Sequence, residues 1–131
     1  MTTRATATFE ITGWEETPYD MPADGPKLVR TTVNKTFRGE MIAESVAELL
    51  MCQSEAGAGY VAAERVVGQI GDRAGTFVIQ HGGTHQGGEV DHAFATVVPG
   101  SGTGDLVGLR GTAAFHHDET GATLTLDYDL P

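Results

Sequence analysis

Residues 60–98 read YVAAERVVGQIGDRAGTFVIQHGGTHQGGEVDHAFATVV, and this stretch carries the strongest structural signal of the chain. It holds three runs rich in β-formers, separated by the turn signals Gly71–Gly75 and Gly87-Gly88. Connections this short join antiparallel strands, because a parallel crossover needs a dozen or more residues. We therefore expect three consecutive antiparallel strands with polar residues in step on one side.

The rest of the chain repeats this pattern of β-rich runs and glycine-marked turns. Thr6–Thr12 and Leu124–Leu130 alternate with period two, which is typical of a half-buried strand. The eight predicted strands are Arg4–Trp14, Leu28–Arg38, Met41–Gln53, Tyr60–Ile70, Thr76–Gln86, Glu89–Val98, Leu106–His116 and Ala122–Leu130. Eight such strands close naturally into a barrel, which also removes unpaired sheet edges. We predict an all-β protein, a single eight-stranded antiparallel up-and-down β-barrel domain over residues 1–131.

Two segments leave room for alternatives. Met41–Gln53 contains good helix formers with apolar residues at helical spacing, but a tight Gly39-Glu40 turn directly precedes it. We interpret it as a strand. Residues 15–26 contain three prolines, Pro18, Pro22 and Pro26, and are expected to form an irregular flap over one end of the barrel.

Composition excludes several classes of function. The formal net charge is −10, and no Lys/Arg cluster offsets it, so we expect no binding to nucleic acid. No apolar run approaches the roughly 20 residues of a membrane span, and we expect no membrane partner. Cys52 is the one cysteine, so a reducing, cytoplasmic setting is the simplest interpretation.

The first turn brings a carboxylate and an imidazole together. A two-residue turn at Asp72-Arg73 predicts three cross-strand pairs, Gly68 with Phe77, Val66 with Ile79, and Glu64 with His81. Tyr60 continues the same row. A carboxylate beside an imidazole fixes its tautomer and stabilises its charged form, which suits a general acid–base and equally a static polar network. We favour a structural or ligand-orienting network over proton transfer in turnover.

A second polar pair is predicted at the Gly39-Glu40 turn. If this is a two-residue hairpin, Lys35 lies opposite Glu44 among apolar neighbours. The pair is either buried, where desolvation demands good geometry, or a surface pair worth about 0–1 kcal/mol. One bulge would reverse the two faces of the strand, so both interpretations stay open.

Further polar and aromatic residues mark the ends of the strands. The Gly87-Gly88 turn predicts Phe94 opposite His81 and His92 opposite Gly83, with His85 on the same row. Three histidines at this spacing are an alternative metal site, but we favour structural or exposed histidines and predict no metal and no other cofactor. Trp14 either lines the mouth of a cavity or plugs one barrel end, and we favour plugging.

The segment Pro99–Asp105 looks like a phosphate loop but lacks its features. It has no Walker lysine, and the sequence after it indicates a strand rather than a helix. We expect a specialised turn here.

Several segments of the chain resemble the bacterial family catalogued as domain of unknown function 3224. They are Ala5–Ile11 with Trp14, Tyr60-Val61 with Glu64–Gly68, Gly75–His81, Val97–Leu106 and Leu126–Leu130. The resemblance implies a small antiparallel barrel similar to allene oxide cyclase and dirigent proteins, often a dimer, so a homodimer is expected. It implies no particular reaction. The family often carries tryptophan where this chain has Phe94.

Three functions follow from these observations. The leading hypothesis is binding of a small, apolar molecule in the barrel interior, because barrels of this size are either filled or hold one small ligand. The residues expected to contact the ligand are Trp14, Lys35, Glu44, Tyr60, Glu64, Val66, Phe77, Ile79, His81 and Phe94. The alternatives are a cyclase or isomerase in which Glu64 and His81 transfer a proton, and a packed structural or interaction module.

Overall fold

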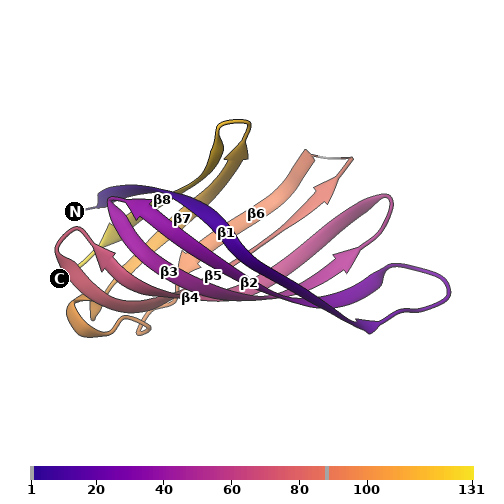
Figure 1. The fold of residues 1–131 in the computed structure, drawn as a ribbon, viewed down its shortest axis with the longest axis horizontal. Coiled ribbons are helices and arrows are strands. Elements are labelled where there is room, and N and C mark those ends of the chain that lie inside the picture. The colour runs from indigo at the N-terminus through magenta and orange to yellow at the C-terminus, as the bar shows by residue number, and fades with distance from the viewer. Residues whose placement is uncertain (1, 88) are drawn as a thin grey trace.

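The computed structural model describes residues 2–87 and 89–131, which form a closed barrel of eight antiparallel strands (Figure 1). Each strand pairs with its neighbours in the sequence, and the first pairs with the last to close the barrel. The strands are β1 Thr3–Asp20, β2 Lys27–Gly39, β3 Met41–Gln53, β4 Gly57–Ile70, β5 Arg73–Gln86, β6 Glu89–Val97, β7 Arg110–Asp118 and β8 Gly121–Asp129. The predicted up-and-down barrel is confirmed. Gly88, part of the predicted Gly87-Gly88 turn, lies outside the described residues.

β3 resolves the ambiguity between helix and strand. Its odd-numbered residues from Met41 to Leu49 face the interior and are buried, whereas Ile42, Val46 and Leu50 on the other face are about half exposed. Because apolar residues occupy both faces, the sequence also matches a helical spacing. The prediction of a strand is confirmed.

β1 is longer than the sequence indicated. It runs to Asp20, so the first half of the predicted flap is strand and the irregular connection is only residues 21–26. β1 pairs with β8 no further than Phe9, and from there to Asp20 it pairs with β2 alone. Pro18 is therefore on an edge, where a missing backbone N–H is tolerated.

The loop between β6 and β7 closes one end of the barrel. It contains a short 3-10 helix, Gly104–Leu106, and buries Leu106 and Leu109 against the core. No helix in the described residues is long and apolar enough to cross a membrane. β7 starts at Arg110, four residues later than predicted, because this loop occupies the preceding positions. We call the end of the barrel that this loop covers the closed end, and both chain termini lie there (Figure 1).

The segment 99–105 of this loop is a structural cap, as the expected specialised turn implies. The backbone N–H of Thr103 donates to the carbonyl oxygen of Thr76 at 2.8 Å, and the N–H of Thr76 donates to the hydroxyl of Thr103 at 3.0 Å. The N–H of Val78 donates to the Ser101 hydroxyl at 3.0 Å. The loop therefore continues the pairing of β5 beyond the end of β6. The hydroxyl groups of Ser101 and Thr103 accept hydrogen bonds from backbone N–H groups of β5.

The other end of the barrel spreads open, and we call it the flared end. β6 and β7 share only the pair Thr96–Thr112, and β1 leaves β8 after Phe9, so the hairpin tips diverge (Figure 1). Ile11 and Trp14 lie opposite inner-face residues of β2, yet they are 46% and 51% exposed. The inner wall of β1 is thus accessible to solvent at this end.

The interior is divided into two apolar clusters. The closed-end cluster is large and contains, among others, Phe9, Phe37, Val66, Phe77, Ile79, Leu106, Leu124 and Leu126. The flared-end cluster is smaller and consists of Val33, Ala47, Leu49 and Ala62, with Met51 and Tyr60 partly buried against it.

Candidate functional site

A belt of polar side chains separates the two clusters, with one residue on each of four adjacent strands. Lys35 of β2, Ser45 of β3, Glu64 of β4 and His81 of β5 all point inward and are 8%, 4%, 0% and 4% exposed. On β2, β3 and β4 the belt residue has a closed-end cluster residue two positions to one side and a flared-end cluster residue two positions to the other. The period of two residues along a strand places all four on the inner face.

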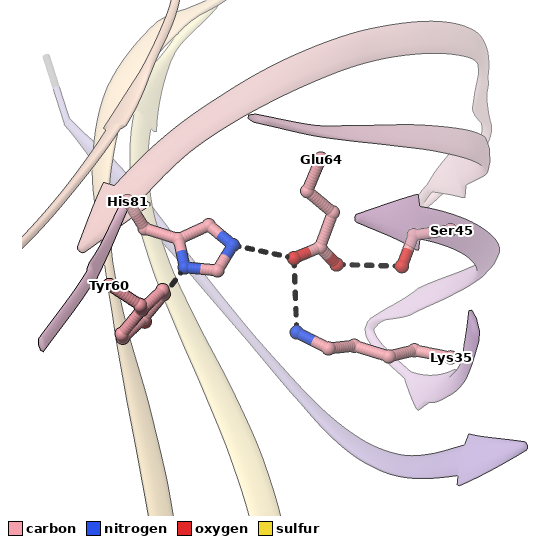
Figure 2. A network of polar contacts seen from close by, with 5 residues as sticks. All are labelled: Lys35, Ser45, Tyr60, Glu64 and His81. Carbon is pink, nitrogen blue, oxygen red and sulfur yellow. Dashed lines mark hydrogen bonds and ion pairs between the residues drawn. The ribbon is translucent and has the colours of Figure 1, made fainter. Parts of the chain in front are cut away.

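Glu64 is the centre of a hydrogen-bond network (Figure 2). Its Oε1 atom lies 3.0 Å from Lys35 Nζ and 2.9 Å from His81 Nε2, and its Oε2 atom accepts a bond from the Ser45 hydroxyl at 2.6 Å. The Tyr60 hydroxyl lies 2.9 Å from the other ring nitrogen, His81 Nδ1. Among the described residues, every buried side-chain nitrogen or oxygen has a hydrogen-bond partner.

The carboxyl group of Glu64 is ionised although it is fully buried. Burial alone raises its pKa, but the hydrogen bond with His81, the charge of Lys35 and the hydrogen bond with Ser45 lower the pKa from 4.5 to about 2. An unpaired carboxylate in this position would be very costly, so Lys35 and Glu64 must be considered as one ion pair.

Aromatic rings enclose the charged end of Lys35. Its Nζ atom lies 4.5 Å from the centroid of Phe115 and 5.1 Å from that of Phe9, which is cation–π geometry. The ring of Phe115 also lies 4.8 Å from that of His81. At this level the interior is therefore filled by side chains from opposite walls. The accessible inner surface begins beyond the belt, toward the flared end.

Tyr60 is the member of the network that extends toward that surface. It is partly buried, whereas Glu64 and His81 are almost completely buried. The pKa of its phenol is raised, first by burial and then by the charge of Glu64. Tyr60 is thus a neutral hydroxyl group at one end of a hydrogen-bonded chain that leads to a buried carboxylate.

The predicted proximity of Glu64 and His81 is observed, although the predicted register is wrong. Ile70 pairs with Arg73, so Glu64 lies opposite Ile79, and His81 lies opposite Ala62. The turn is Gly71-Asp72, and the register differs from the predicted one by two residues. A shift of two residues keeps each side chain on the same face of its strand. Glu64 and His81 are therefore diagonal instead of direct neighbours, and their long side chains still meet.

The predicted pairing of Lys35 with Glu44 is wrong. Lys35 lies opposite Ser45, and Glu44 lies opposite Thr36 on the outer face, where it is exposed. The connection between β2 and β3 shifts the register by one residue, and a shift of one reverses the faces. The inner carboxylate partner of Lys35 is Glu64, from the next strand.

Phe94 does not line the interior as predicted. A register shift between Thr84 and His85 places Phe94 opposite Gly82, and this residue is 46% exposed on the outside of the barrel. A Cβ atom on Gly82 would come within 2.8 Å of that ring, so the glycine makes room for it.

The same shift separates the three histidines of the alternative metal site. His92 lies opposite Thr84 instead of Gly83, and both His92 and His85 are exposed whereas His81 is buried. Within the described part of the chain, no group of three His, Cys, Asp or Glu residues has the geometry of a metal site.

Other predicted contact residues fall into two groups. Val66, Phe77 and Ile79 are packed in the closed-end cluster with at most 1% exposure. They fill the interior on the closed-end side of the belt and leave no surface there for a ligand. Trp14 does not plug a barrel end, because it is 51% exposed at the flared end, whereas Leu106 and Leu109 fill the closed end. Its indole N–H donates to Glu16 at 3.0 Å on the inner side of the flared end.

Sequence reasoning missed Ser45, Phe9 and Phe115. Ser45 would have emerged from the correct pairing of β2 with β3, which sets it opposite Lys35. Phe115 reaches His81 across the interior from a strand that is not its neighbour. Local pairing rules contain no signal for such a contact.

Comparisons with other proteins agree on one family. The profile described as "Protein of unknown function (DUF3224)" matches residues 5–130. A crystal structure of a DUF3224 protein of unknown function from Shewanella oneidensis MR-1 is similar, with 34% sequence identity and a TM-score of 0.86. The similarity covers 100% of this chain and 98% of that one. A search of curated proteins found no match.

Proposed function

Since the chain belongs to the DUF3224 family of proteins of unknown function, we propose a function from the geometry of its own polar network. The barrel binds a small, largely apolar molecule at its flared end, with Tyr60 oriented to meet a polar group of that molecule. Barrels of this size have room for one small ligand where side chains leave the interior unfilled.

One observation carries this proposal: a network of buried polar and charged side chains ends at Tyr60, a partly buried residue that packs against the flared-end cluster. Glu64 and His81 have each polar atom engaged, and Tyr60 is their link to the accessible inner wall. A network that served packing alone would have no need to extend toward the opening. A preorganised polar group in apolar surroundings is what orients a ligand in a binding site.

The apolar part of the ligand would contact the inner wall of the flared end. Ile11 and Trp14 of β1 are about half exposed there, and Met51 and Tyr60 are partly buried beside the flared-end cluster. Large aromatic and aliphatic surfaces that remain exposed on an inner wall favour an apolar partner.

Calorimetric titration with benzene and naphthalene derivatives tests the proposal. We expect saturable binding that Tyr60→Phe and Trp14→Ala weaken. The matched control is Phe94→Ala, because this aromatic residue lies on the outer face. Absence of binding by every compound, or equal weakening by Phe94→Ala, would contradict binding at the flared end.

The cyclase or isomerase alternative has one supporting observation, the continuous hydrogen-bonded chain from Glu64 through His81 to Tyr60. Every polar side-chain atom of Glu64 and His81 already has a hydrogen-bond partner within the network. A substrate would therefore contact Tyr60. The raised pKa of Tyr60 opposes a phenolate base. The geometry thus favours ligand orientation over proton abstraction.

We also propose a cytoplasmic setting. The chain has a single cysteine, Cys52, and needs no disulfide to hold its barrel closed. Fractionation of cells that express the full chain tests this assignment, and recovery outside the cytoplasm would contradict it.

A further inference from the structure

We infer that the ligand presents a hydrogen-bond donor, an alcohol or phenol hydroxyl, to the Tyr60 oxygen when the His81 ring is neutral. The inference rests on the proposed function and specifies the chemical class of the ligand. It follows from the positions of the protons in the network, taken in order from the buried end.

The first proton is fixed by Glu64. An ionised carboxylate only accepts hydrogen bonds, and Glu64 accepts from Lys35 and Ser45 as well as from the ring of His81. The His81 Nε2 atom, 2.9 Å from Glu64 Oε1, must therefore carry a proton.

The second proton is fixed by the tautomer that results. A neutral imidazole with its proton on Nε2 has a lone pair on Nδ1. The Tyr60 hydroxyl, 2.9 Å from Nδ1, must donate its only proton to that lone pair. The Tyr60 oxygen then has only lone pairs left, so it accepts from a ligand hydroxyl and cannot donate to a carbonyl group.

If the His81 ring carried a second proton, the hydrogen bond between His81 and Tyr60 would run in the opposite direction. Nδ1–H would donate to the Tyr60 oxygen, and the phenol proton would be free for a ligand acceptor. The charged or titratable groups that face the ring are Glu64 and Tyr60 of β4 and Lys35 of β2. From the other elements the ring meets uncharged residues, Ala95 of β6 and Phe115 of β7.

Matched ligands test the direction of the hydrogen bond at Tyr60. The probes are naphthylmethanol, methyl naphthyl ketone and naphthalene, with the corresponding benzene series, titrated by calorimetry at about pH 8. We expect the alcohol to bind about 3- to 10-fold more tightly than the ketone, the effect of one net hydrogen bond.

Variants distinguish this inference from the proposed function. Tyr60→Phe should abolish the alcohol preference while the apolar part still binds, and Tyr19→Phe, an exposed tyrosine on β1, should leave it unchanged. Circular dichroism checks that each variant is folded. Binding of all probes without an alcohol preference, or a preference that survives in Tyr60→Phe, overturns the inference alone. Failure of every probe to bind overturns the proposed function with it.

Discussion

Glu64 keeps its charge inside the barrel because three side chains from three other strands meet its two oxygens. The group is fully buried, and its pKa is about 2 in the folded protein against an ordinary value of 4.5. A carboxyl group whose pKa is lowered by folding stabilises the protein above its unfolded pKa. That stabilisation is lost as the pH falls through the folded pKa.

We predict that acid destabilises the wild-type protein through Glu64. Between about pH 6 and pH 2 the pKa difference is worth about 3 kcal/mol of unfolding free energy, and Glu64→Gln should lack this part of the pH dependence. Urea unfolding across this pH range measures it. Glu44→Gln is the matched control, because Glu44 is exposed on the outer face and should keep the wild-type slope. Equal slopes for the wild type and Glu64→Gln would contradict the assignment.

At the scale of the strands, register decides which sequence predictions survive. Periodicity and turn residues predicted the barrel and the inward orientation of Glu64 and His81, because the error of two residues at their turn preserved the faces. The β2–β3 connection and the bulge after Thr84 introduced errors of one residue, which moved Glu44 and Phe94 to the outside. Such odd shifts depend on local backbone conformation that residue types do not specify uniquely.

Another element-level prediction concerns the cap at the closed end. A Cβ atom on Gly75 would overlap the carbonyl oxygen of Thr103, so Gly75→Ala must displace the loop from β5. We expect a loss of at least about 2 kcal/mol in unfolding free energy. Gly71→Ala is the control, because its φ of 60° costs about 1 kcal/mol but nothing lies within 4 Å of the added atom. Thermal unfolding of both variants compares them, and equal losses would contradict the capping role.

At the scale of the whole molecule, the outside of the barrel carries an apolar face. Across β3, β4 and β6 the half-exposed apolar side chains are Ile42, Val46, Leu50, Val61, Val67 and Phe94. Leu50, Val61, Gly82 and Phe94 are successive cross-strand partners, and Leu50, Val61 and Phe94 border a groove of about 560 Å³. Among the described side chains, Glu44, Glu48 and Arg65 lie on the outer faces of β3 and β4, and Arg30 of β2 forms an ion pair with Glu48. These four charges balance, although the chain carries −10 overall.

An apolar face whose described charges balance, on an acidic molecule, favours a second copy of the same chain as its partner. We predict a homodimer through this face, which Leu50→Glu combined with Val61→Glu converts to a monomer. Sedimentation equilibrium measures the mass. Val107→Glu, an exposed residue of the closed-end loop, should leave the dimer intact. A wild-type monomer at all concentrations, or dissociation by Val107→Glu, would exclude this interface.

The position of Trp14 makes it an intrinsic fluorescence probe of the flared end. It is the one tryptophan of the chain, about half exposed on the inner side of the flared end. Its fluorescence can therefore be excited without a competing indole elsewhere, and its emission responds to the polarity of that one location. A ligand that replaces water there shifts the emission to shorter wavelength, so libraries of unlabelled compounds can be screened by spectrum alone.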